Sequence, residues 1–169
     1  RGLPGDVLAG EAQRALRIAL FERDSVRAIA VLQSALERHP LNSMPALDRP
    51  YGVLATAYTI AGQPTQGKRL LSEYETAVPE GQRRGEPAWY RARGWLALAE
   101  SRPRDAVQEF RRMATDGQRA DWGWWETGIA FERANLPDSA LLAYERAVQP
   151  GGTGWRAIED PWARAPSLK

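Results

Sequence analysis

The sequence has no cysteine and only one histidine, His39, among its 169 residues. Without cysteine there is no disulfide bond, cysteine-based zinc site or thiol catalysis, and a lone histidine gives a metal site no second imidazole. His39 lies directly before Pro40 at a predicted helix end, where a helix-terminal or exposed role is favoured over a catalytic one. We therefore expect the chain to hold no metal and no cofactor.

The sequence also lacks a long apolar run and a marked excess of either charge. No stretch approaches the roughly 20 apolar residues of a membrane-spanning helix, so we expect no membrane insertion. The formal net charge is only +2, which gives no reason to expect a nucleic-acid partner. Hydrophobic residues still make up 43% of the chain, enough for a single folded domain over residues 1–169. A cytoplasmic location is favoured, with the extracytoplasmic part of a membrane-anchored protein as the alternative.

Groups that could carry out catalysis are scattered rather than clustered. Acidic residues lie near one another at three places, where solvated surface is a better interpretation than an acid–base pair. These places are Glu73 with Glu75, Glu126 with Glu132, and Glu159 with Asp160. The glycine-rich run 151–154 lacks the Lys-Ser/Thr pair of a phosphate-binding loop and is expected to join two helices. We expect no catalytic residue and no enzyme activity.

What the sequence does contain is an internal repeat. Gly94 matches Gly128 and Phe110 matches Tyr144, each pair 34 residues apart. Two shifts of 39 residues align earlier copies, so two of the three joints between copies carry five extra residues. A period in this range is typical of repeat proteins. The copies fall at approximately 9–40, 48–79, 87–118 and 121–150, and residues 151–169 form a tail or the start of a truncated further repeat.

Each copy contains two apolar-periodic stretches of helical length, which predict a pair of helices. Gly62 and Asn135 suit the left-handed end of a first helix, and proline suits the first turn of a second helix. The breaks between the two helices are expected near Asp24, Gln63, Arg102 and Leu136, and the prolines are Pro64, Pro103 and Pro137. One pair cannot bury its apolar face alone, so the pairs must pack on one another. The sequence therefore predicts an all-α protein of about eight helices.

The repeat resembles a known family. The fourth copy reads Trp124-Trp125-Glu126-Thr127-Gly128-Ile129-Ala130-Phe131 and continues with Ala140, Tyr144 and Ala147. These aromatic, glycine and alanine landmarks are similar to those of tetratricopeptide repeats, whose period is about 34 residues. The resemblance implies a right-handed superhelical solenoid of about four antiparallel helix pairs, acting as a protein–protein interaction scaffold. The first copy departs most, because Leu16 replaces the small residue and Ala19 the aromatic one.

A narrower resemblance offers an alternative function. The runs 46–51, 73–79 and 94–100 are similar to repeat regions of some bacterial multidomain regulators, which follow a serine/threonine kinase or a related signalling domain. This resemblance implies a regulatory or sensor module of a longer signalling protein, from which the present chain would be a fragment. No glycine loop or catalytic-loop motif of a kinase occurs in the chain, so no kinase activity is expected.

The family resemblance also places a candidate binding site. In tetratricopeptide arrays the first helices line a concave groove that takes a peptide or a partner surface. By column, the groove is polar in the second repeat, at Thr56 and Thr59, and becomes aromatic and aliphatic in the third and fourth repeats. Aromatic and arginine residues are enriched at binding hot spots. We therefore predict a partner-binding groove at Arg91, Trp95, Leu98, Trp122, Trp125, Ile129 and Glu132.

Two alternatives to this groove remain. In the first, Trp122 and Trp125 pack on the C-terminal tail, which contains Trp155 and Trp162. In the second, the solenoid binds a carbohydrate or another small ligand, because aromatic platforms also stack on sugars. A protein or peptide partner is the main prediction.

Overall fold

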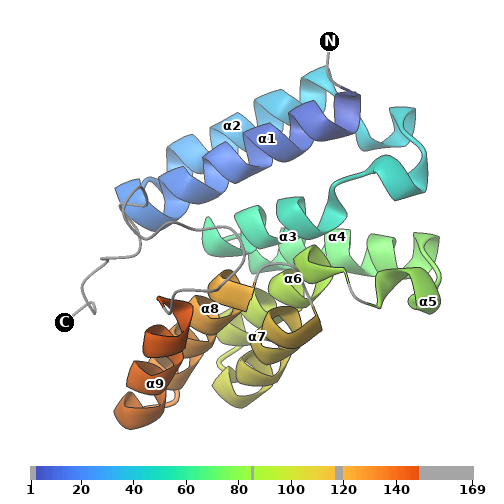
Figure 1. Cartoon of the computed structure of the whole chain (residues 1–169). Coiled ribbons are helices and arrows are strands. Elements are labelled where there is room, and N and C mark those ends of the chain that lie inside the picture. Colours follow the sequence, from blue (N-terminus) through green and yellow to red (C-terminus); the bar gives the residue numbers. More distant parts are fainter. Residues whose placement is uncertain (1–2, 85, 117–119, 149–169) are drawn as a thin grey trace.

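The computed structural model describes residues 3–84, 86–116 and 120–148 of the chain. These residues are all-helical, with no strand among them, which confirms the predicted fold class. Eight long helices form four successive pairs (Figure 1). The pairs are α1 (Pro4–Arg17) with α2 (Ser25–Arg38), α3 (Tyr51–Ile60) with α4 (Pro64–Ala77), α6 (Pro87–Ala99) with α7 (Pro103–Asp116), and α8 (Ala120–Arg133) with α9 (Pro137–Ala147).

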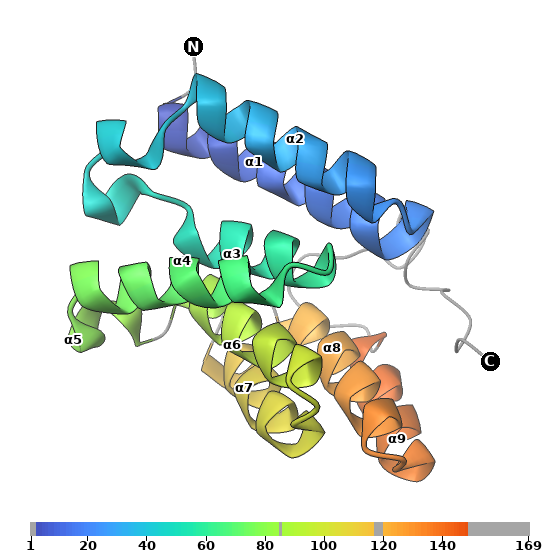
Figure 2. The same ribbon diagram turned by 180° about the vertical axis from the view of Figure 1, so that it is seen from behind.

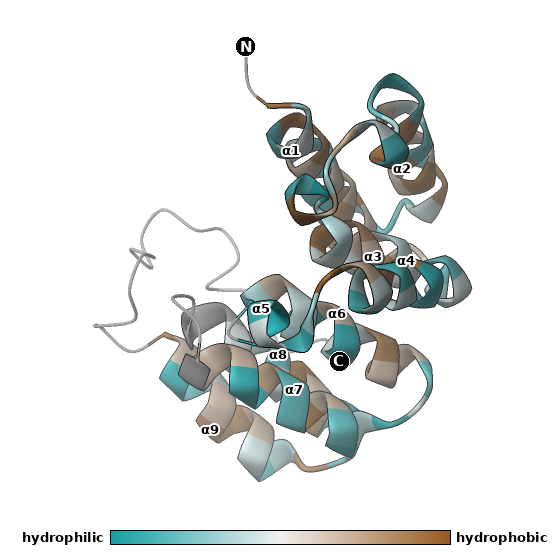
Figure 3. Cartoon of the chain, turned by 90° about the vertical axis from the view of Figure 1, so that its right-hand side faces the viewer, coloured by the Kyte–Doolittle hydropathy of each residue, from teal (hydrophilic) through white to brown (hydrophobic). Residues whose placement is uncertain are grey.

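Shorter elements lie outside this pattern and were not predicted. A π-helical turn (Ile18–Glu22) extends α1, and two 3-10 turns (Leu41–Ser43 and Ala46–Asp48) connect the first pair to the second. The four-residue helix α5 (Glu80–Arg83) connects the second pair to the third and has hydrophilic colouring in Figure 3. The 3-10 turns and α5 occupy the two joints with five extra residues.

The breaks inside the pairs fall where the sequence predicts them. Gly62 and Asn135 have the left-handed backbone expected of them, with φ of 85° and 58°. Arg23 and Ser101 adopt the same conformation at the equivalent places, although neither is the glycine or asparagine that favours it. The next helix then begins with proline in α4, α7 and α9, where the missing N–H has no partner to lose.

Inside the pairs, glycines let aromatic rings from the second helix lie against the first. A Cβ on Gly94 would clash with the ring of Phe110, and a Cβ on Gly128 would clash with the ring of Tyr144. Phe110 is completely buried. The same contact therefore recurs 34 residues later, which confirms the alignment of the third and fourth copies at the level of side-chain packing.

Between the pairs, the packing differs from joint to joint (Figures 1 and 2). The first pair contacts the second chiefly through α1 and α3, and the second contacts the third chiefly through α3 and α6. The third pair contacts the fourth chiefly through α7 and α8. Two buried clusters result, and α6 contributes to both: Leu96 belongs to the first cluster and Ala97 to the second. No helix in the described part of the chain is long and apolar enough to cross a membrane.

Candidate functional site

The predicted groove residues of α6 point at α8 and meet there on a carboxylate. The Nε of Arg91 and the Nε1 of Trp95 each donate to Oε1 of Glu126 over 2.7 Å. Arg91 and Trp95 lie one turn apart on α6, so both reach the same residue of α8. The structure thus links the third and fourth repeats through three polar side chains.

Glu126 corrects an expectation from the sequence. It was expected on solvated surface, but its side chain is fully buried. The reason is its position: α8 presents this residue to the donors of α6, a pairing of residues 31 and 35 positions apart that no local spacing indicates. Oε2 of Glu126 has no hydrogen-bond partner. A buried carboxylate held on one side only makes the local geometry sensitive to any change in its donors.

Burial governs the electrostatics of Glu126. Loss of water raises the pKa of its carboxyl, while the Arg91 guanidinium and the hydrogen bonds from Trp95 and Arg91 act in the opposite direction. Desolvation is the largest of these influences, so the pKa lies above its usual value of 4.5. The charged form is tolerated here because its partners are supplied by a neighbouring helix pair.

Trp95 and Leu98 are held by the core as well. The ring of Trp95 packs edge-on against Phe110, with centroids 6.0 Å apart and an interplanar angle of 66°. Leu98 is buried in the cluster that also contains Ala97 and Val107. Trp95 remains half-buried, with part of its surface open to solvent. Of these two residues, only Trp95 offers surface to a partner.

The predicted residues of α8 are placed less uniformly. Trp125 and Ile129 are half-buried, and Glu132 is exposed. Glu132 accepts a hydrogen bond from Tyr144, and burial together with this carboxylate raises the pKa of the Tyr144 hydroxyl. The side chain of Trp122 lies outside the described residues, as do Trp155 and Trp162 of the tail. The structure therefore brings Trp95, Trp125 and Ile129 forward as the partly open apolar residues of the predicted groove.

The polar half of the predicted groove is not a surface. Thr56 is fully buried and Thr59 nearly so. Each hydroxyl donates to a backbone carbonyl one turn earlier in α3, Thr56 to Gly52 and Thr59 to Ala55, over 2.8 Å. The expectation that Thr56 and Thr59 line an open groove is wrong, because α3 is packed by α1, α4 and α6.

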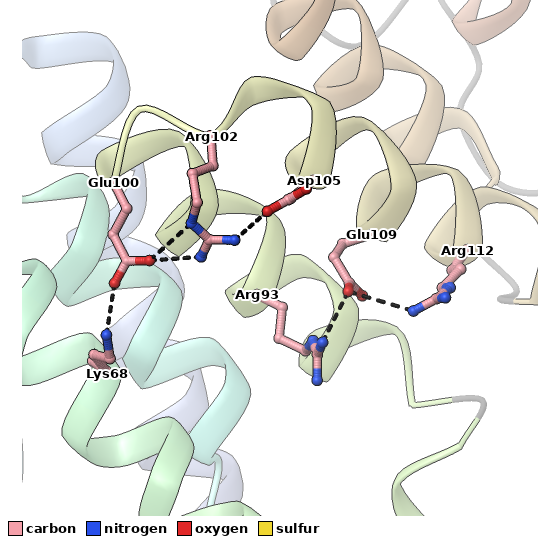
Figure 4. Close-up of polar contacts among 7 residues, drawn as sticks. All are labelled: Lys68, Arg93, Glu100, Arg102, Asp105, Glu109 and Arg112. Atoms are coloured by element: carbon pink, nitrogen blue, oxygen red, sulfur yellow. Dashed lines mark hydrogen bonds and ion pairs between the residues drawn. The ribbon is translucent and has the colours of Figure 1, made fainter.

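A second polar cluster, which the sequence did not reveal, surrounds a cavity of about 310 Å³ lined by α4, α6 and α7 (Figure 4). Lys68 lies 2.8 Å from Glu100, and Arg93 lies 3.0 Å from Glu109. Arg102 bridges Glu100 and Asp105 in the same cluster. These charges already compensate one another, so the cavity has no clear preference for an anion or a cation.

The inserted helix α5 closes one end of this region. Arg83 donates to the carbonyl oxygens of Glu75 and Val78 at the end of α4, which satisfies acceptors that a helix end leaves open. Its guanidinium lies 5.4 Å from the ring centre of Trp89, and that of Arg93 lies 4.9 Å from the same ring. The five extra residues therefore have a packing role in the joint.

No group of three or more acidic or histidine side chains in the described ranges could hold a metal ion. The chain matches no family model, no curated protein and no solved structure. Its function must therefore be argued from the residues and the geometry.

Proposed function

We propose that the chain is a protein-interaction scaffold of tetratricopeptide-like repeats, which form a right-handed superhelical solenoid and bind a peptide or partner surface. The supporting observation is the tie between α6 and α8. Arg91 and Trp95 are fixed on buried Glu126, and Trp125, the neighbour of Glu126 in the chain, is half-buried with part of its surface in solvent. Nothing in the described residues suggests a reaction centre, so we propose binding rather than catalysis.

Preorganisation is the physical reason why this arrangement suits binding. Ordering a flexible side chain at an interface costs about 0.5–1.5 kcal/mol. Trp95 has already lost this freedom, since its N–H is bound to Glu126 and its ring packs on Phe110. Half-exposed indoles in a fixed setting can bury much area with little further loss of freedom, and truncating such a residue typically costs roughly 2 kcal/mol or more in binding.

Photo-crosslinking tests the proposal. A benzophenone amino acid at Ile129 should give an adduct with one defined protein in native lysate, and Trp125→Ala should abolish this adduct. The same probe at Thr65, which is exposed on α4, should not give it. Gln33→Ala, an exposed change on α2, serves as the matched control. Equal adducts from both probe positions, or an adduct that survives Trp125→Ala, would contradict binding at this surface.

A further inference from the structure

The second helices of the four repeats carry two equivalent positions, seven residues apart, on their outer face. The repeat alignment gives these pairs as Ile29 with Leu36, Lys68 with Glu75, Val107 with Ala114, and Leu141 with Val148. Residues seven apart lie on one side of a helix, so each pair reports whether that side is covered. The four pairs can be compared directly.

In α7 the pair is apolar and covered. Val107 and Ala114 are only 9% and 6% exposed. The helix α8 covers them closely: the Cβ of Ala114 lies 2.6 Å from where a Cβ on Gly123 would be. An apolar pair is what a dry helix–helix contact requires.

In α4 the pair is polar and uncovered. Here α6 packs chiefly on α3, and Lys68 and Glu75 instead line the cavity beside α4. Both side chains are exposed. The residue types at these positions thus follow the environment, apolar where a helix covers the face and polar where water reaches it.

In α9 the pair is apolar but exposed. Leu141 and Val148 are 59% and 50% exposed, and the adjacent Leu142 is 60% exposed. The residues that pack on α8 from the other side of this helix are Ala140 and Ala143. By comparison with α7, the outer face of α9 has the composition of a covered face, but no described part of the chain lies on it.

The occupant is argued from chain order and charge. On α7 the cover is the chain that follows, since α8 begins at Ala120 soon after α7 ends at Asp116. The chain that follows α9 contains Trp155, Ile158 and Trp162, at spacings of three and four residues. A tryptophan buries 150–250 Å², and a tethered segment binds at high effective concentration.

The charges agree with this occupant. Asp138 and Glu145 each precede one of the two apolar residues by three positions on α9 and are exposed. The equivalent residues of α7 are Arg104 and Arg111, so the face of α9 has the opposite sign. Arg156 lies next to Trp155 in the following segment and supplies the complementary charge. We propose that residues 155–162 of the same chain cover the outer face of α9 at Leu141 and Val148. This inference is independent of the proposed groove.

Fluorescence in the full chain tests the inference, because the absence of cysteine allows one label at a chosen position. A bimane on Leu142→Cys should be quenched by a nearby indole, and replacing Trp155 and Trp162 by Phe should raise its emission. Leu141→Ser with Val148→Ser should raise it as well. Bimane on Gln108→Cys, the equivalent exposed position of α7, should be unaffected, and circular dichroism checks each fold.

Two results would overturn the inference. If emission at position 142 does not change when the two tryptophans are replaced, the segment does not lie on α9. If the quenching falls on dilution, the indoles come from a second copy of the chain rather than from its own tail.

Discussion

The joint between the second and third helix pairs and the joint between the third and fourth are built differently from equivalent helices. At the first, α6 packs chiefly on α3, and a cavity of about 310 Å³ with paired charges lies beside α4. At the second, α8 packs on α7 through apolar residues, and a buried carboxylate is held by α6. The first joint carries five extra residues and the second carries none.

The comparison indicates that the pair is the constant unit and the joint is the variable one. Gly94 with Phe110 and Gly128 with Tyr144 pack alike, whatever follows or precedes them. The inserted helix α5 provides Arg83, which caps α4 and stacks on Trp89. A short insertion can thus change which helix receives the next pair, while the interior of each pair stays the same.

The largest expected effect is inside a pair. Phe110→Ala should destabilise the protein by roughly 3–5 kcal/mol, because it removes a fully buried ring and leaves a cavity against Gly94. Tyr144→Ala should cost less, since Tyr144 is only half-buried in the last pair. Chemical denaturation measures both. Equal losses would mean that the two pairs do not differ in burial as the structure describes.

The charge tie between the last two pairs should be nearly as important. Glu126→Ala removes the partner of Arg91 and should cost roughly 3–5 kcal/mol, because it leaves a largely buried charge uncompensated. The double variant Arg91→Met with Glu126→Leu should lose much less, since apolar residues can replace a buried ion pair. Urea unfolding of the three variants checks this order. A double variant as unstable as Glu126→Ala would show that packing, rather than charge, is lost.

A matched exchange compares the two joints directly. Val107→Lys should cost roughly 1–3 kcal/mol, because it places a charge under α8. Lys68→Val, at the equivalent position of α4, should change stability by no more than about 0.5 kcal/mol, since that side chain is exposed. Thermal unfolding at fixed pH measures both. Similar costs at the two positions would end the distinction between a dry and a wet joint.

The smallest effect is a pH dependence confined to the second joint. The folded pKa of Glu126 is raised above its usual 4.5, so its contribution to stability is fully present below that pH and is lost as the pH rises through the folded pKa. Wild type should therefore lose stability relative to Glu126→Gln over this range, by at most about 1.4 kcal/mol per pH unit. Denaturation midpoints at several pH values test it. Parallel curves for the two proteins would contradict a raised pKa.

Much of the fold could be predicted because it follows from local residue types. Prolines at the start of α4, α7 and α9 and the left-handed Gly62 and Asn135 are dictated by backbone chemistry. Small residues at Ala106 and Ala140 are buried as their columns indicate. These features repeat because each pair solves the same packing problem.

The candidate site could be predicted only in part. The columns identified Arg91, Trp95 and Trp125, but not that Glu126 would be the common acceptor for the first two. The burial of Thr56 was also missed. Both depend on which helix lies opposite, and this depends on the joints, whose geometry is set by inserted residues such as Arg83 rather than by the repeat.

The division of α6 between the two buried clusters affects how the chain comes apart. Repeat proteins lose structure by separating neighbouring units, yet neither cluster can open here without removing side chains from α6. Local opening should therefore begin at the outer helices α1, α2 and α9, where only one cluster is involved. Amide protons in the middle of α6 would then exchange last, at a rate set by global unfolding. The helix at the centre of the chain would hold the two halves in one cooperative unit.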